Sequence, residues 1–290
     1  MLSQNIPDFD ALWNYSHPEL TETKFREILL HTPEDDPAFL ELLTQIARAQ
    51  GLQRKFEKAH RTLGQVEWRL GDSASRVKVR YLLERGRLLN STGHSDQAHP
   101  FFEQALDFAQ QIPDDFYAVD ALHMLAIISP PDQSLDLNLR AIQLAESSAQ
   151  ERALNWLGSL YNNTGWSYHD KGEYTSALNI FEKAEAWQRS HGRVSETRIA
   201  VWTVARALRS LGRFTTALSK QMALKDEFTS AGEADGFVLE EIAECLLALK
   251  REREAQPYFK KAYEILCQDD WFAEHETVRL KRIKKLGKID

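Results

Sequence analysis

Residues 161–184 read YNNTGWSYHDKGEYTSALNIFEKA, and this stretch decides the fold. Gly165 and Ala177 place small residues where two antiparallel helices would cross, and Phe181 places an aromatic ring beside them. Gly172 falls where the first helix must end and the chain must turn, a position that favours a residue tolerant of positive φ. The stretch therefore predicts two antiparallel helices joined by a tight turn.

The same arrangement of small and aromatic residues recurs along the chain. LLERGRLLNSTGHSDQAHPFFEQA (82–105) and VARALRSLGRFTTAL (204–218) repeat it, a later unit has Lys250 in place of the turn glycine, and two weaker units lie near 43–66 and 122–141. Self-similarity at a fixed period indicates a stacked array of helix pairs. The residues at the first crossing position of each second helix lie 36 to 43 residues apart, at Ala59, Ala98, Ser134, Ala177, Ala217 and Ala255.

These motifs resemble the tetratricopeptide repeat over roughly residues 37–266, with units longer than the standard repeat of about 34 residues. The resemblance implies an all-α solenoid, a right-handed superhelix of about six helix pairs with helical caps at both ends. The alternative is a generic amphipathic helical bundle, since Ala and Leu at helical spacing are common. A bundle would not, however, reproduce small residues at both crossing positions in every unit.

The two ends read as caps of one continuous solenoid domain. In 1–36, Pro18 begins a predicted helix that runs to about His31, and Asp36-Pro37 signals the start of the next helix. In 267–290 we predict one helix with Asp269 or Asp270 as its N-cap. Its apolar anchors would be Trp271, Phe272, Val278, Leu280 and Ile283, and its basic run is Lys281, Arg282, Lys284, Lys285 and Lys288.

That basic run has two interpretations. Cations late in a helix interact favourably with its dipole, so a solvated cap end is preferred. A patch for nucleic acid or anionic lipid is the alternative. The formal net charge of −7 disfavours nucleic acid as a partner, because phosphate backbones are bound by Lys and Arg.

The composition is that of a folded protein, with 43% hydrophobic and 27% charged residues. No window approaches the ~18 consecutive apolar residues of a membrane span, and residues 1–20 show no secretory signal, so we predict no membrane association. Only two cysteines, Cys245 and Cys267, are present. They indicate a reduced, cytoplasmic protein in which both are core residues.

The first helices of stacked pairs line the concave wall of a superhelix, which is the usual ligand surface of such arrays. The offsets that face this groove are rich in basic and aromatic residues until the last unit, which brings Glu240 and Glu244. Arg pairs with carboxylates, Asn can hold a peptide backbone, and Trp supplies contact area, so we predict an acidic peptide or protein partner held between the second and fifth units. The predicted binding residues are Arg80, Arg87, Asn90, His123, Asn162, Asn163, Trp166, His169, Trp202, Arg206 and Arg209, with Arg48 on the same row.

Members of the tetratricopeptide family that clamp a terminal carboxylate use a defined set of Lys, Asn and Arg positions. Only Asn163 matches that set here, and Ile199 and Trp202 occupy neighbouring positions in the next unit. This departure argues against such a clamp. His169-Asp170 reads as a solvated turn in preference to an acid–base pair, because it comes directly before the turn glycine.

We therefore predict a scaffold or adaptor without enzymatic activity, cofactor or metal. The histidines show no metal-ligand spacing, and the sequence has no phosphate loop or nucleophile elbow. The alternative is a regulatory sensor whose superhelix changes shape when a peptide or small ligand binds. Regulators of that kind carry an effector domain, for which the ~36 residues before the array leave little room. Self-association through an uncapped end of the array stays open.

Overall fold

The computed structural model describes residues 9–71, 75–112 and 114–289, and over these ranges it contains helices and no strand. The molecule divides into two compact units, residues 1–157 (unit 1) and 158–290 (unit 2). The all-α solenoid predicted from the sequence is confirmed. Within the described part, no helix is both long and apolar enough to span a membrane.

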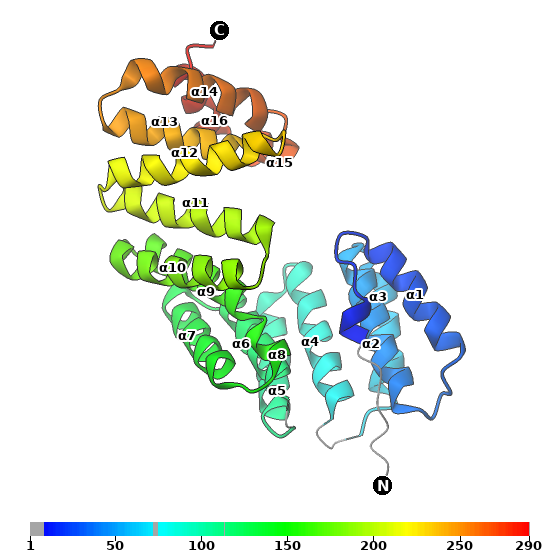
Figure 1. The fold of residues 1–290 in the computed structure, drawn as a ribbon. Helices are drawn as coiled ribbons and strands as arrows, with labels where there is room; N and C mark the ends of the chain where they lie inside the picture. Colours follow the sequence, from blue (N-terminus) through cyan, green and yellow to red (C-terminus); the bar gives the residue numbers. More distant parts are fainter. Residues whose placement is uncertain (1–8, 72–74, 113, 290) are drawn as a thin grey trace. The chain divides into compact units, whose positions relative to one another are not determined.

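In unit 1 each repeat is a pair of helices, and the first helix of a pair also packs on the first helix of the next pair (Figure 1). The N-terminal turn and the cap helix come before the pairs, and a one-turn helix follows them. The elements of unit 1 are η1 (Phe9–Leu12), α1 (Pro18–Leu30), α2 (Pro37–Leu52), α3 (Phe56–Glu67), α4 (Arg76–Ser91), α5 (Ser95–Ala109), α6 (Asp115–Ile128), α7 (Pro131–Ser147) and α8 (Glu151–Leu154).

Unit 2, taken by itself, is also built of helix pairs, and α9/α10, α11/α12 and α13/α14 carry the remaining predicted motifs (Figure 1). A broken pair of short helices packs beneath α14 and ends the chain. The elements of unit 2 are α9 (Leu157–Asp170), α10 (Tyr174–Ser190), α11 (Val194–Ser210), α12 (Phe214–Ser230), α13 (Gly236–Ala248), α14 (Glu252–Leu266), α15 (Asp270–His275) and α16 (Thr277–Leu286).

In the pairs α4/α5 and α9/α10, a glycine of the first helix lies against a phenylalanine ring of the second, as predicted. A Cβ atom built on Gly86 of α4 would lie 2.4 Å from the ring of Phe102 in α5, and one built on Gly165 of α9 would lie 2.4 Å from the ring of Phe181 in α10. Both rings are fully buried. Because no side chain fits between helix and ring, glycine is the residue that permits this approach.

The turn within a pair contains a residue with positive φ, as predicted, except between α6 and α7, where Ser129 and Pro130 have negative φ. Gly172 has φ of 76°, and Lys250, which replaces the turn glycine in the last pair, is held at φ of 58°. A lysine in this region is strained by contact between its Cβ and its own backbone. The repeat pattern therefore imposes the turn even where the residue disfavours it.

The caps are partly as predicted. The side chain of Asp36 accepts from the amide of Ala38, and that of Asp269 accepts from Phe272 N at 2.8 Å, so both N-caps are confirmed. Residues 1–8 of the predicted N-terminal cap lie outside the described residues. The predicted single C-terminal helix is wrong, because the chain leaves helical geometry at Glu276 between α15 and α16.

The break at this point has a packing reason. It lets Phe272 and Ile283 enter the same core cluster, where both are fully buried. Trp271 and Val278, predicted as apolar anchors, are instead 62% and 82% exposed. Arg282 of the basic run pairs with Glu244 of α13, so it ties the cap to the last pair.

Candidate functional site

The predicted site residues of unit 1 lie in a chain of ion pairs along α2, α4 and α6. Arg87 of α4 contacts Glu84 at 2.5 Å and the carboxylate of Asp120 in α6. Arg48 of α2 reaches the same Glu84 at 2.9 Å. Glu84 and Asp120 are both 4% exposed. The positive charge predicted for this face is therefore balanced by carboxylates of the neighbouring first helices.

Arg80 is more deeply placed than predicted. Arg80 is 5% exposed. Its Nε lies 3.0 Å from Glu41 Oε1, and its two Nη atoms donate to Asp10 of η1. Burial raises the pKa of Glu41 although Arg80 opposes this shift. Arg80 thus belongs to a buried charge cluster and adds little to an open surface.

Two further residues of unit 1 have local roles. The side chain of Asn90 accepts a hydrogen bond from Ser95 Oγ at 2.8 Å across the α4–α5 turn. The ring of His123 packs 5.1 Å from that of Trp156, and its Nδ1 is buried without a hydrogen-bond partner. Desolvation lowers the pKa of His123, so the ring is neutral. Neither arrangement forms a pocket with the paired arginines.

In unit 2, Arg206 and Arg209 of α11 both pair with Glu241 of α13. Arg209 donates to both carboxylate oxygens at 2.7 and 2.9 Å, and Arg206 Nε lies 3.3 Å from Glu241. His169 Nε2 lies 2.9 Å from Ser210 Oγ. Burial and the charge of Arg206 lower the pKa of His169. These contacts link the C-terminal ends of α9 and α11 to α13.

The neighbouring Asp170 does not complete a catalytic pair with His169. The separation is 3.8 Å, and the side chain of Asp170 is 78% exposed. A base that orients a catalytic histidine is normally within hydrogen-bond reach and shielded from water. The interpretation as a solvated turn fits this geometry.

An apolar cavity opens at the N-terminal halves of α11 and α13, with a volume of about 470 Å³. Trp202 forms one wall, and its ring lies 6.0 Å from Trp166 and 6.4 Å from Phe237. Ile199 is 58% exposed beside it. The cavity is lined by Ser195, Arg198, Ile199, Trp202, Leu224, Phe228, Glu233, Asp235, Phe237 and Val238.

A smaller hollow of about 190 Å³ adjoins it between α9, α10 and α11. Asn162 and Asn163 line this hollow, and Ile199 borders both cavities. A Cβ on Gly158 would lie 2.3 Å from Gln188 Nε2, so the absence of a side chain there leaves room for Gln188. We call the two cavities together the α9–α11 groove.

The α9–α11 groove holds polar groups that the protein does not satisfy. Within the described residues, the carboxamides of Asn162 and Asn163 form no hydrogen bond, and Trp202 Nε1 and Gln188 Oε1 are buried without a partner. The Asn162 and Asn163 side chains are half-buried, so their carboxamides are open to a ligand as well as to water, whereas Trp202 Nε1 and Gln188 Oε1 are closed off from solvent. Carboxamides offer one acceptor and two donors, which match the C=O and N–H of a peptide group.

The structure therefore brings Asn162, Asn163, Trp166 and Trp202 together and leaves the arginines in ion pairs. Phe237 and Arg198 of the groove were missed by sequence reasoning. Phe237 follows the N-cap of α13, so it lies at the helix start and not at the offsets used for the prediction. The guanidinium of Arg198 stacks 4.4 Å from the ring centroid of Phe228 and pairs with Glu233 at 2.9 Å.

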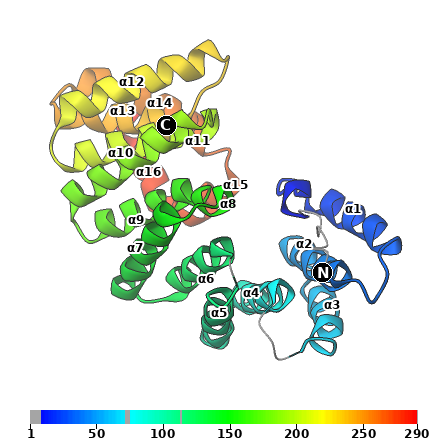
Figure 2. The ribbon, with the colours of Figure 1, turned by 60° about the horizontal axis from the view of Figure 1, so that its bottom comes forward.

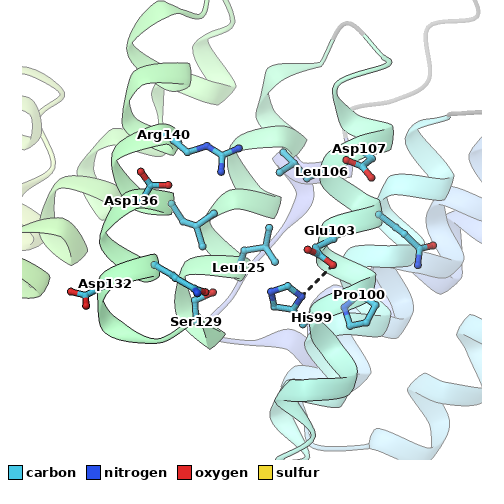
Figure 3. A pocket seen from close by; sticks show the side chains of 13 residues that line it. His99, Pro100, Glu103, Leu106, Asp107, Leu125, Ser129, Asp132, Asp136 and Arg140 are labelled. Atoms are coloured by element: carbon cyan, nitrogen blue, oxygen red, sulfur yellow. Dashed lines mark ion pairs between the residues drawn. The ribbon is translucent and has the colours of Figure 1, made fainter.

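A larger hollow of about 900 Å³ lies in unit 1 between α5 and α7, the second helices of their pairs. The C-terminal end of α6 forms its base. In Figure 3 its carboxylates come from both walls, with Arg140 on the α7 side and the His99–Glu103 ion pair on the α5 side. The carboxylates of Glu103, Asp107 and Asp136 are exposed to solvent. Such open, hydrated charges do not by themselves select a ligand.

Among the described residues, no group of His, Cys, Asp and Glu could hold a metal ion. Cys245 is buried and Cys267 half-buried, and both are free thiols. Burial raises the pKa of Cys245 to about 12, so this thiol is inert near neutral pH.

Comparison with known proteins supports the repeat pattern. Residues 158–191, which span α9 and α10, match the tetratricopeptide repeat family model. A search with the sequence finds no match among curated proteins. The repeat recognised in the sequence is thus confirmed where its pattern is clearest.

Solved structures match over most of the chain. The apo form of RapI has 14% sequence identity and a TM-score of 0.76, covering 95% of this chain and 78% of its own. The apo quorum sensor NprR from B. thuringiensis has 13% identity and a TM-score of 0.63, covering 92% and 75%. A signal transduction ATPase with a tetratricopeptide repeat sensor from Pyrococcus horikoshii has 15% identity and a TM-score of 0.72, covering 92% of this chain and 41% of its own. At these identities the likeness shows a shared fold.

Proposed function

Because this chain is built from tetratricopeptide repeats, we propose that it is a non-catalytic scaffold or adaptor that binds a peptide or protein partner through the first helices of its repeats. The binding site in this proposal is the α9–α11 groove of unit 2. The observation that carries it is an apolar cavity walled by Trp202 beside a hollow lined by Asn162 and Asn163, two half-buried carboxamides with no hydrogen bond to the described residues.

The groove fits an extended peptide with one apolar side chain. The carboxamides of Asn162 and Asn163 would hold a peptide group, and the 470 Å³ cavity would take the side chain that follows. Trp202 contributes contact area through its ring. Arg206 and Arg209 keep their pairing to Glu241 in this arrangement, so they position α11 without binding the peptide.

The remaining parts of the proposal follow from charge and cysteine state. We propose a reduced, cytoplasmic setting, in keeping with two free thiols. Nucleic acid is excluded from the proposal because the net charge is −7 and the arginines of the first helices pair with carboxylates. Self-association is left as an outcome of the binding experiments.

The test is a selection of binders from a randomised peptide library on the full-length chain, followed by affinity measurements on variants. We expect Asn162→Ala with Asn163→Ala to weaken a selected peptide about tenfold or more, from about 1 kcal/mol for each lost hydrogen bond. Trp202→Ala should weaken it further, because truncating an aromatic anchor in a binding pocket often costs about 2 kcal/mol or more.

Asn179→Ala is the matched control, because Asn179 is an exposed asparagine on α10 outside the groove. It should leave the affinity unchanged. If the groove variants bind every selected peptide as tightly as the wild type, the α9–α11 groove is not the binding site and the proposal fails.

A regulatory sensor is the second candidate. Two of the similar structures come from proteins named as sensors, and both share this fold. A sensor would change its shape on binding, so small-angle scattering with a saturating peptide should show compaction. An unchanged scattering profile with a bound peptide supports the adaptor.

A further inference from the structure

The N-terminal turn of unit 1, residues 9–15, packs on α2, the first helix of the first pair. Its helical part, η1, lies beside the cap helix α1 (Figure 2). Trp13 Nε1 donates to Gln45 Oε1 of α2 at 2.9 Å. The rings of Trp13 and Tyr15 stack at 4.9 Å, and the Arg48 guanidinium lies 5.7 Å from each ring centroid. The turn thus contacts the face that tetratricopeptide arrays offer to ligands.

Asp10 anchors this turn through its carboxylate. Arg80 of α4 donates from Nη1 to Oδ1 at 3.1 Å and from Nη2 to Oδ2 at 2.7 Å, a bidentate contact. Arg152 of α8 donates to Oδ2 from a second helix. Burial acts to raise the pKa of Asp10, but the two arginines outweigh it and hold the pKa below its ordinary value. Paired, charge-assisted contacts of this kind are the strong ones in carboxylate recognition.

The two arginines are held in place by groups other than Asp10. The Arg80 guanidinium lies 5.1 Å from the ring centroid of Tyr117, and its Nε is 3.0 Å from Glu41. The Arg152 guanidinium lies 4.2 Å from the ring of Phe116 and 5.7 Å from that of Tyr117. The Tyr117 hydroxyl is buried without a hydrogen-bond partner. Because these supports come from α2 and α6, the arginine pair is a preformed carboxylate site.

We propose that Arg80 and Arg152, together with Gln45 and Arg48, form a second peptide-binding site, which the N-terminal turn occupies as an internal ligand. The external ligand is an acidic peptide with an aromatic residue three positions after its carboxylate, the spacing from Asp10 to Trp13. Charge favours this partner, since withdrawal of Asp10 removes the carboxylate that Arg80 and Arg152 share, while Glu41 stays beside Arg80 and Glu84 beside Arg48. The site lies in unit 1 and does not depend on the α9–α11 groove.

The experiment uses the full-length chain with Asp10→Ala and Trp13→Ala, which detaches the turn but keeps Phe9 in its core. Phe9 is 1% exposed and packs against Phe25. The probe is a fluorescein-labelled peptide of residues 10–16, DALWNYS, followed by fluorescence anisotropy. We expect the double variant to bind this peptide at least tenfold more tightly than the wild type does.

Two controls establish that the carboxylate is what the site recognises. A peptide with Asn at the position of Asp10 should bind the double variant at least tenfold more weakly. Adding Arg152→Ala to the double variant should weaken the original peptide similarly, while adding Arg140→Ala, an exposed arginine of α7, should not. Where the double variant loses its helical circular dichroism, Asp10→Asn alone replaces it in the same titration.

Equal affinity of the wild type and the detached variant overturns the proposal, because the turn would then be a structural cap only. Equal binding of the Asp and Asn peptides also overturns it. If the wild type forms dimers that the free peptide dissociates, the natural occupant is the same turn of a second copy, and the separate acidic partner is overturned.

Discussion

Gly165→Ala should destabilise the protein although alanine is the better helix former. The new Cβ would lie 2.4, 2.5 and 2.9 Å from three atoms of the Phe181 ring, where van der Waals contact needs about 3.5–4.0 Å. The ring is fully buried and is wedged 5.4 Å from Trp166, so relief requires α9 to move away from α10. Overpacking of this kind costs about 1–3 kcal/mol, against about 1 kcal/mol gained in helix propensity.

The net effect expected for Gly165→Ala is a loss of up to about 2 kcal/mol in the free energy of unfolding, measured by urea unfolding followed by circular dichroism. Gly64→Ala is the matched control, since Gly64 lies inside α3 and its Cβ would meet nothing within 4 Å. It should stabilise by about 0.5–1 kcal/mol. If both substitutions raise the urea midpoint, the close approach of α9 to Phe181 is refuted. Phe181→Leu added to Gly165→Ala should recover part of the loss.

Three further substitutions test other parts of the structure. Lys250→Gly should raise the free energy of unfolding by about 1 kcal/mol and so raise the urea midpoint, because Lys250 has φ of 58° and glycine tolerates that angle. Glu241→Ala should cost about 2–4 kcal/mol in urea unfolding, since it leaves the half-buried Arg206 and Arg209 without their carboxylate. Asp10→Asn should lower the thermal midpoint at neutral pH. The gap to the wild type should close as the pH falls below about 4, because the depressed pKa of Asp10 gives stability that is complete above the unfolded value of 3.8 and is lost as the pH falls through the folded value.

Helix pairing could be predicted from the sequence because its determinants lie close together in the chain. Gly165 and Phe181 are 16 residues apart, and the turn glycine between them fixes which helices meet. The sterics of a helix crossing depend on side-chain volume alone, which the residue types state directly. The same reasoning reached Gly86 and Phe102, whose contact has the same geometry.

The partners of the arginines could not be predicted in the same way. Arg87 pairs with Asp120 and Arg209 with Glu241, 33 and 32 residues along the chain. An arginine on the first helix of one repeat therefore pairs with a carboxylate on the first helix of the next repeat. The residue types along a single helix do not show these ion pairs. A comparison of equivalent positions in successive repeats would have shown them.

The break between α15 and α16 at Glu276 could not be predicted from the spacing of apolar residues either. Trp271 and Val278 are apolar and lie at helical spacing with Phe272 and Ile283, yet only the latter two are buried. The break depends on which residues reach the core beneath α14. That is a property of packing across the end of the array, and periodicity within one helix does not contain it.

The two proposed binding sites differ in whether a group of the protein already occupies them. In unit 2 the Asn162 and Asn163 carboxamides line the α9–α11 groove without a bond to the described residues, so the peptide that we propose there would displace no side chain from them. In unit 1 Asp10 occupies the proposed carboxylate site, so the acidic peptide that we propose there would first have to displace the N-terminal turn. Association that requires a conformational change is slower than association with a preformed site. The two proposed sites should therefore differ in on-rate, and Asp10→Ala with Trp13→Ala should accelerate binding to unit 1 while leaving the rate at the α9–α11 groove unchanged.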